Sequence, residues 1–454
     1  MLFTEINYFL FLAACSIAYS CLPSKYRSCF LLVASYIFYA AFDWRFTFLL
    51  LGQTLLCFFC AKYRKNTLAV ILSILELTVF KYFNFFNDSF RLLFERLHLP
   101  YLIPHLDILL PIGISFFTFQ SLGYVIDVSR GKIQPENDLM RIGLFTAFFP
   151  QIAAGPIGRA DELLPQLQEA KRPTAQHIAD GIQLIIWGLF QKMVVADRLA
   201  SYINRAYASP KTATGGTLLI ASIFFSIQIY ADFSGYTDIA RGSAKFFGIN
   251  LRNNFNFPYF AISIPDFWKR WHISLTSWFR DYLYIPLGGN RVSKTKWIRN
   301  QLAVFLLSGL WHGANWTFIF WGTTHGIFNL AHIMLLGKNK ESQSRLINLM
   351  RCIISFTIVN TAWIFFRAPT FKRAIQIITR ILTHPGRPTF GVSQITFALN
   401  IIAIIILFSV DFAVYRGFTA ERCPDFIRIP GYALLACLIA LLAVSSNSFI
   451  YLQF

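Results

Sequence analysis

The sequence is dominated by apolar segments that recur along its whole length of 454 residues. A helix needs ~20 consecutive apolar residues to cross a bilayer, and it satisfies its own backbone hydrogen bonds where no water is present. Several of the segments are shorter than this, so we expect some helices to be tilted, broken or re-entrant. The segments lie at residues 6–22, 28–42, 46–61, 67–86, 106–126, 139–155, 178–196, 217–232, 301–322, 323–336, 346–366, 395–414 and 431–450. We therefore predict an all-α, polytopic integral membrane protein with about eleven to thirteen hydrophobic segments, forming one domain over residues 1–454.

The composition and the placement of charge agree with a membrane protein. Hydrophobic residues make up 56% of the chain and charged residues only 14%, whereas soluble domains average roughly 25% charged residues. The net charge of +19 would suggest nucleic-acid binding in a soluble protein, but here the cations cluster after the first and third apolar segments, as Lys25, Arg27, Lys62, Arg64 and Lys65. Cytoplasmic loops carry such an excess. We therefore predict an extracytoplasmic N-terminus, contact with membrane lipids and no nucleic-acid partner.

The region 233–300 is the most basic part of the chain, with ten basic and three acidic residues. Within it, Ser263 is a suitable N-cap and Pro265 suits a first helical turn, which predicts a helix over about residues 265–284. Aromatic side chains and His272 follow helical spacing on one face of this segment, and lysine and arginine lie on the other. We expect this amphipathic helix at the cytoplasmic membrane boundary, with its basic face toward phosphates and His272 pointing into the bundle.

His312 lies inside the apolar run 301–322, which is long enough to cross the membrane. A titratable side chain at membrane depth is costly, so it is a functional hypothesis by default. On a helix its ring would be surrounded by small residues such as Gly313 and by the amide of Asn315, which leaves room for a substrate beside it. His272 taken alone has an ordinary explanation as well, a buried histidine bonded to a backbone carbonyl, and this alternative stays open.

Three shorter patterns interrupt the apolar segments. The sequences PIG at 111–113 and GPIG at 155–158 break otherwise apolar runs. Such breaks are tolerated where backbone lines a cavity, so both are expected to border a substrate path. The polar run DFSGYTD at 232–238 is either the lining of a cavity or a helix end capped by its own side chains, because buried polar groups need partners.

Three long motifs resemble those of the membrane-bound O-acyltransferase family. They are FWKRWHIS at 267–274, WFRDYLYIPLGGNR at 278–291 and LWHGAN at 310–315. PIGISF at 111–116, DFSGY at 232–236 and FIYLQF at 449–454 fit the same pattern, so the resemblance covers nearly the whole chain. It is strongest to the bacterial branch that contains the membrane subunits of alginate and peptidoglycan O-acetyltransferases, and weaker to the D-alanyl transferase branch.

This resemblance implies a helical bundle around a central funnel, in which a cytoplasmic acyl donor and an extracytoplasmic acceptor meet. It also implies an O-acetyltransferase of the bacterial inner membrane that uses acetyl-CoA as a substrate and holds no bound cofactor or metal. The acceptor would be an exported cell-envelope polysaccharide, alginate-like or peptidoglycan. A periplasmic or membrane-anchored acetyltransferase would act as its partner.

The resemblance implies that His312 is the key catalytic histidine and that His272 occupies the second functional position. We expect His312 to act as the general base toward an acceptor hydroxyl, and His272 to stabilise the oxyanion or orient the donor. Asn315 is a candidate for holding the correct imidazole tautomer. The candidates for binding the phosphates of coenzyme A are the arginines of the basic region, Arg270, Arg280 and Arg291.

Two alternatives stay open at the level of sequence. Tyr451, near the predicted outer face, either accepts the acetyl group transiently and passes it to a partner, or anchors the last helix at the interface. The protein as a whole could instead be a transporter or flippase for a lipid-linked glycan or acyl intermediate, whose histidines would relay protons. Inverted repeats would favour a transporter, and none is evident in the sequence.

Overall fold

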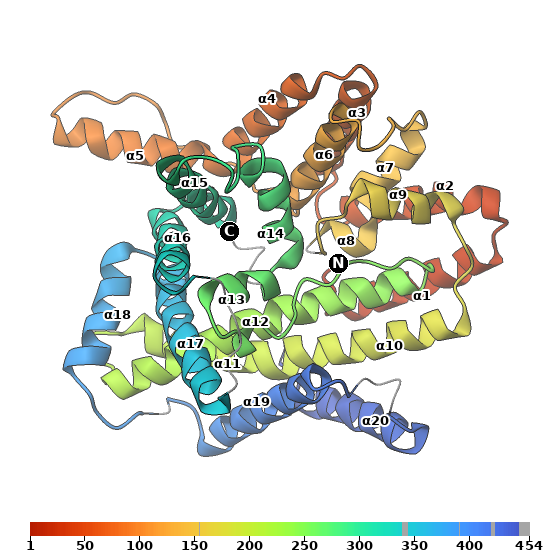
Figure 1. Ribbon diagram of the computed structural model, residues 1–454. Helices are drawn as coiled ribbons and strands as arrows, with labels where there is room; N and C mark the ends of the chain where they lie inside the picture. The colour runs from red at the N-terminus through yellow and green to blue at the C-terminus, as the bar shows by residue number, and fades with distance from the viewer. Residues whose placement is uncertain (154, 338–343, 390, 419–422, 445–454) are drawn as a thin grey trace.

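The computed structural model describes residues 1–153, 155–337, 344–389, 391–418 and 423–444. These residues form helices joined by turns and loops, and no strand occurs among them. Figure 1 shows the helices gathered in a bundle, with α12 and α10 lying side by side through its lower half. The prediction of an all-α protein is confirmed.

Short interruptions divide the helices. The first are α1 (Ile6–Cys21), α2 (Ser24–Ala40), α3 (Arg45–Lys62), α4 (Asn66–Leu77), the π-helical turn η1 (Thr78–Tyr82), α5 (Phe83–Arg96), α6 (Ile114–Ser129), α7 (Leu139–Ala147) and α8 (Phe149–Ile152). There follow α9 (Ala160–Glu169), α10 (Ala175–Leu189), the π-helical segment η2 (Phe190–Ala196), α11 (Asp197–Ala208), α12 (Gly215–Lys245), the 3-10 turn η3 (Pro258–Phe260), α13 (Ile264–Arg270), α14 (Ile273–Phe279) and the π-helical turn η4 (Arg280–Tyr284). The last are α15 (Lys294–His312), α16 (Trp316–Leu336), α17 (Arg345–Arg367), α18 (Phe371–Thr383), α19 (Gln394–Tyr415) and α20 (Asp425–Leu442).

Within the described residues, seven helical segments are long and apolar enough to cross a membrane. They are Arg45–Lys62, Asn66–Arg96, Ala175–Ala208, Gly215–Lys245, Arg345–Arg367, Gln394–Tyr415 and Asp425–Leu442. Other apolar stretches of the sequence form shorter or interrupted helices, as expected from their length. The stretch 139–155, for example, is divided into α7 and α8 at Phe148, whose backbone leaves the helical region two residues before Pro150. The protein is a multi-pass membrane protein.

Helix α12 is the most buried of these segments, and its polar run 232–238 lies in the helix interior. The alternative of a capped helix end is therefore wrong. The carboxylate of Asp232 instead lies 2.7 Å from the ammonium of Lys192 in η2, which is also 2.7 Å from Asp197. All three side chains are almost fully buried. Buried charges persist where they are paired, so this run joins α12 to η2 and α11.

The predicted helix over 265–284 is not continuous, which corrects the sequence analysis. Its start is right, since the hydroxyl of Ser263 accepts a hydrogen bond from Asp266 N at 3.1 Å. The helix then stops after α13 and restarts as α14, because the preceding segment bonds into the gap: Ile273 N donates to the carbonyl of Asn254 at 2.9 Å. The centre of the region is buried and packs against α16 and α17. It is therefore not a straight helix with one exposed face.

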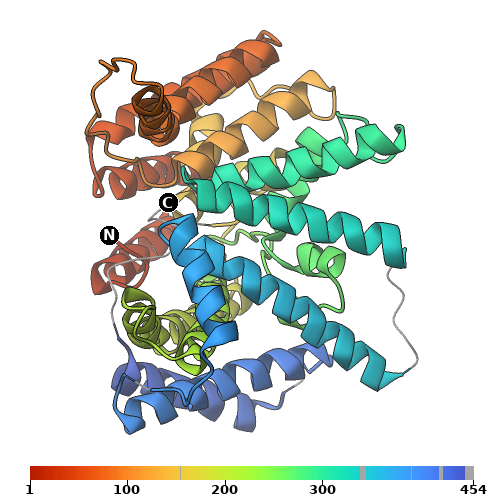
Figure 2. The same cartoon turned by 90° about the vertical axis from the view of Figure 1, so that its left-hand side faces the viewer.

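The run 301–322 is also not one helix. Helix α15 ends at His312 and α16 begins at Trp316, and the two pack as an antiparallel hairpin, visible as the adjacent teal helices in Figures 1 and 2. The close approach depends on glycine: a Cβ on Gly309 would lie 2.3 Å from the carbonyl oxygen of Phe318. Small residues allow such helix contacts in membranes. His312 consequently lies at the tip of a helical hairpin.

Candidate active site

The two histidines singled out from the sequence lie close together. The ring centroids of His272 and His312 are 6.3 Å apart. Both residues are buried, with exposed fractions of 1% and 3%. Four elements meet here, because α6, α12, the α13–α14 break and the end of α15 each contribute a ring to the contact.

His272 is positioned by the break between α13 and α14. Its backbone has φ +44° and ψ +53°, the left-handed region that side chains other than glycine rarely adopt. Such a conformation costs about 1–3 kcal/mol and persists only where the surroundings impose it. Here the hydrogen bonds from Ile273 N and Ser274 N to Asn254 impose it. The imidazole points inward, 4.7 Å from the ring of Phe233 in α12.

His312 is the last residue of α15, and its ring lies among aromatic side chains. The ring centroids of Trp321 in α16 and Phe366 in α17 are 5.0 and 5.5 Å away. The space that Gly313 was expected to leave for a substrate is occupied, because a Cβ there would lie 2.2 Å from the ring of Phe318. That expectation is wrong. The small residues next to His312 serve the packing of the hairpin.

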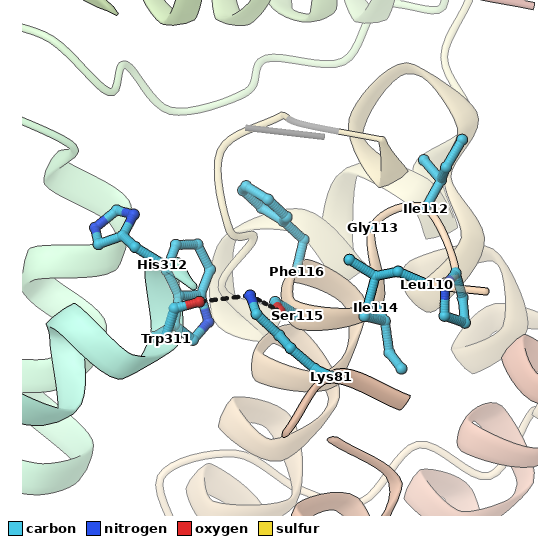
Figure 3. Close-up of a pocket in the computed structure, with 10 residues that line it drawn as sticks. Lys81, Leu110, Ile112, Gly113, Ile114, Ser115, Phe116, Trp311 and His312 are labelled. Carbon is cyan, nitrogen blue, oxygen red and sulfur yellow. Dashed lines mark hydrogen bonds between the residues drawn. The ribbon is translucent and has the colours of Figure 1, made fainter. Parts of the chain in front are cut away.

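Open space is found on another side of His312. A small recess is bordered by His312 and Trp311, by the start of α6 and by Lys81 of η1. Figure 3 shows the ammonium of Lys81 between the carbonyl of Trp311 and the hydroxyl of Ser115. The PIG sequence at 111–113 lines this recess.

A second, smaller recess lies at the other break in the sequence. Its lining includes Gln120, Gln151 and the stretch 155–157. The ring of Phe116 borders both recesses. This ring lies 6.4 Å from that of His272 and 5.3 Å from that of Trp311. Both sequence breaks thus reach the vicinity of the two histidines.

Asn315 does not make the contact expected of it. Its side-chain oxygen accepts a hydrogen bond from Thr317 N at 2.9 Å, and its side-chain nitrogen donates to the carbonyl of Pro369 at 3.2 Å. Asparagine is a favoured N-cap because it satisfies the first backbone donors of a helix. Asn315 therefore caps α16 and ties the hairpin tip to the end of α17, where the sequence analysis expected a bond to the imidazole of His312.

The three candidate arginines have different surroundings. Arg270 pairs with Asp266 at 2.9 Å, and its guanidinium lies 5.7 Å from the ring centroid of Tyr415. Arg280 is exposed and pairs with Asp281 at 2.7 Å. Arg291 is exposed directly after the Gly-Gly turn that follows η4.

A buried arginine that the sequence analysis missed lies near Arg280. Arg159 is only 5% exposed, pairs with Asp281 at 2.7 Å and lies over the ring of Tyr282 at 4.5 Å. A cation that directly follows the GPIG break was the available signal. Nearby, Asp161 pairs with Lys132 at 2.8 Å. Partial burial acts to raise the pKa of Asp161, but the hydrogen bond and charge of Lys132 outweigh it and hold that pKa below its usual value.

Two further residues close to His312 were not singled out from the sequence. His325 of α16 is fully buried, and Trp321 lies between it and His312, with ring centroids 5.1 and 5.0 Å away. Lys81 lies in the apolar segment 67–86, so the argument that singled out His312 applied to it equally.

Tyr451 lies outside the described residues, and its role stays a prediction. Among the residues described, no group of three or more His, Cys, Asp or Glu side chains could hold a metal ion.

The fold and this site define a multi-pass helical membrane protein with a buried imidazole pair beside an open recess, an arrangement suited to proton transfer within the membrane. Comparison with known proteins identifies the family to which this membrane protein belongs. The chain belongs to the membrane-bound O-acyltransferase family, whose sequence profile matches residues 136–366. Both histidines lie within the matched residues. The protein is an O-acyltransferase, and the alternative of a transporter is set aside.

Relatives with assigned names cover most of the chain. A probable alginate O-acetylase of Pseudomonas aeruginosa is 39% identical over 82% of this chain and 72% of its own length. One from Azotobacter vinelandii is 36% identical over 92% of this chain and 85% of its own. A peptidoglycan O-acetyltransferase of Helicobacter pylori is 35% identical over 77% of this chain and 72% of its own. The resemblance predicted from the motifs is confirmed.

Proposed function

We propose that the protein transfers an acetyl group from cytoplasmic acetyl-CoA across the bacterial inner membrane for O-acetylation of an exported cell-envelope polysaccharide. The relatives named for alginate and peptidoglycan acetylation support the acetyl group and the class of acceptor. The observation that carries the proposal is the meeting of His272 and His312 in the protein interior, beside a recess that opens at His312. A periplasmic or membrane-anchored acetyltransferase completes the modification as partner.

In this proposal His312 is the general base. It takes the proton of an acceptor hydroxyl as that oxygen attacks the carbonyl carbon of the thioester. The new C–O bond forms, the C–S bond breaks, and the departing thiolate takes up a proton from the imidazolium, so the histidine ends neutral again. General-base assistance of this kind contributes roughly 10²–10⁴-fold to the rate. The recess bordered by His312 gives the hydroxyl its approach.

His272 stabilises the negative charge that develops on the carbonyl oxygen, or orients the donor. Its left-handed backbone is fixed by Asn254, so the ring is held in place before the substrate arrives. A donor held ready in this way stabilises an oxyanion without reorganisation during the reaction, and one such donor is worth roughly 10²–10³ in kcat.

Arginines of the basic region bind the phosphates of coenzyme A from the cytoplasmic side. Arg280 and Arg291 are exposed, so phosphate oxygens can reach them. Arg270 would have to share its guanidinium with Asp266, which it already binds. Guanidinium groups suit this task because they bind phosphate with two parallel hydrogen bonds.

Tyr451 remains our candidate for a transient acetyl carrier. The test is Tyr451→Phe, and unchanged acetylation of the polymer would contradict this role.

The test is His312→Ala, expressed in a strain that lacks the chromosomal gene. Ester-linked acyl groups released from the surface polysaccharides by mild base are identified and quantified by mass spectrometry. We expect acetate in the wild type and its loss in His312→Ala. His384→Ala is the matched control, since His384 is exposed at the end of α18. Acetate release equal to that of the wild type from His312→Ala would remove the proposal, and release of D-alanine would correct the acyl group.

A further inference from the structure

The end of α15 is held by side chains from a distant part of the chain. The last four carbonyl groups of an α-helix have no partner within the helix. Two of these in α15 belong to Leu310 and Trp311, directly before His312. The hydroxyl of Tyr82 donates to the carbonyl of Leu310 at 3.1 Å, and the ammonium of Lys81 donates to that of Trp311 at 2.6 Å.

Both donors belong to η1, the π-helical turn between α4 and α5. Single π-helical turns are rare and occur often at functional sites. Here the turn directs two consecutive side chains, Lys81 and Tyr82, to two consecutive carbonyls of another helix. Lys81 also donates to the hydroxyl of Ser115 at 3.2 Å, which ties the end of α15 to α6 (Figure 3).

The backbone of α15 holds its own last turn only weakly. The hydrogen bond from Gly313 N to the carbonyl of Gly309 is 3.4 Å long, beyond the usual range of about 2.7–3.2 Å. After Gly313 the chain leaves the helix and enters the hairpin turn. The orientation of His312 therefore depends on contacts from outside the helix, and the bonds to the carbonyls of Leu310 and Trp311 hold the backbone directly before it.

The choice of a lysine also needs an explanation. Its ammonium is only partly exposed, lies in an apolar segment and has no ion pair with a carboxylate in the described part of the chain. A neutral donor would be enough to cap a carbonyl, as Tyr82 shows. The amine of Lys81 donates to the carbonyl of Trp311 and to the hydroxyl of Ser115 at the same time, which a side chain with a single donor proton, such as Tyr82, cannot do.

We propose that Lys81 and Tyr82 are positioning residues of the acyl transfer: they fix the last turn of α15 and so keep His312 directed toward its substrates. This inference rests on the proposed function of His312. A residue that merely stabilises the fold would change how much protein is present and how easily it unfolds. A positioning residue changes the rate of the chemical step while substrate binding stays the same.

The test uses Lys81→Met, which keeps the length of the side chain and removes its charge and donors, and Tyr82→Phe, which removes one hydroxyl. Matched controls are Lys65→Met and Tyr63→Phe, because both side chains are exposed at the junction of α3 and α4. For each variant, kcat, KM for acetyl-CoA, membrane protein level and thermal midpoint are measured in membranes or detergent.

We expect kcat of Lys81→Met to fall roughly 10- to 100-fold, since a misplacement of about 1 Å costs up to 10²-fold. For Tyr82→Phe we expect a fall of about 2- to 10-fold, the range of one neutral hydrogen bond. KM should change less than about twofold if ground-state binding is unaffected, and the controls should match the wild type. Tyr82→Phe carries the test alone if Lys81→Met is absent from the membrane.

Wild-type kcat in either variant would overturn the inference. A raised KM with unchanged kcat would also overturn it, since Lys81 would then bind substrate. A loss of activity that only follows the loss of protein would show a structural role instead. His312→Ala distinguishes failure of the positioning role from failure of the proposed function. If His312→Ala is inactive while Lys81→Met and Tyr82→Phe are fully active, only the positioning role fails. If His312→Ala is active, the proposed function fails.

Discussion

Gly309→Ala is predicted to slow catalysis although Gly309 does not line the recess at His312. The added Cβ would lie 2.3 Å from the carbonyl oxygen of Phe318, about 1.1 Å short of the 3.4 Å at which ordinary contact begins. That atom belongs to the backbone of α16, so one helix must move by about 1 Å. Overpacking of this kind costs typically ~1–3 kcal/mol, and Gly309 lies one turn before His312 on the same helix.

The expected result is a fall of kcat by roughly 10²-fold, the cost of a misplacement of about 1 Å, with a lower thermal midpoint. The assay measures acetyl transfer in membranes at matched protein levels. Gly52→Ala in α3 is the control, since a Cβ there meets nothing within 4 Å and the backbone is already helical. Wild-type kcat in a correctly inserted Gly309→Ala protein would refute the reasoning that hairpin packing places His312.

Two further predictions concern buried side chains that can carry a charge, His272 and Lys192. His272→Asn is a suitable variant because an asparagine side chain tolerates the left-handed backbone. It should lower kcat by roughly 10²–10³-fold if one oxyanion donor is lost. A raised KM for acetyl-CoA would indicate donor orientation instead, and unchanged kinetics would contradict both roles. Lys192→Met should lower stability by about 3–5 kcal/mol, because the carboxylates of Asp197 and Asp232 would stay buried without their counter-charge. This prediction is tested by comparing the thermal midpoints of Lys192→Met and Lys65→Met, and equal midpoints would contradict it.

The sequence predicted the helical class and the pair of histidines because both depend on local properties. Length of apolar run decides whether a segment can cross the bilayer, and an ionisable group within such a run is conspicuous. The N-cap at Ser263 was predictable for the same reason, since its bond to Asp266 N lies within one turn.

The errors lie where distant contacts override local pattern. Nothing local to residues 265–284 indicates that Asn254 bonds to Ile273 N and breaks the helix at His272. The hairpin at 312–316 did carry signals, a glycine and a capping asparagine, but the apolar length of 301–322 outweighed them in the prediction. Lys81 and Arg159 each carried a local signal, a cation in an apolar segment and a cation after the GPIG break, but their partners, at 311 and 281, are far away in sequence and could not be predicted.

The central proposal is that His312 acts as the base in the transfer of an acetyl group that acetyl-CoA supplies at the cytoplasmic face. Inside-out membrane vesicles that carry the protein, with the acceptor polysaccharide and the partner transferase enclosed in the lumen and radiolabelled acetyl-CoA supplied outside, test this directly. We expect base-labile label on the polymer with the wild type, and a rate lower by roughly 10²–10⁴-fold with His312→Ala. Equal incorporation by His312→Ala and the wild type would contradict it.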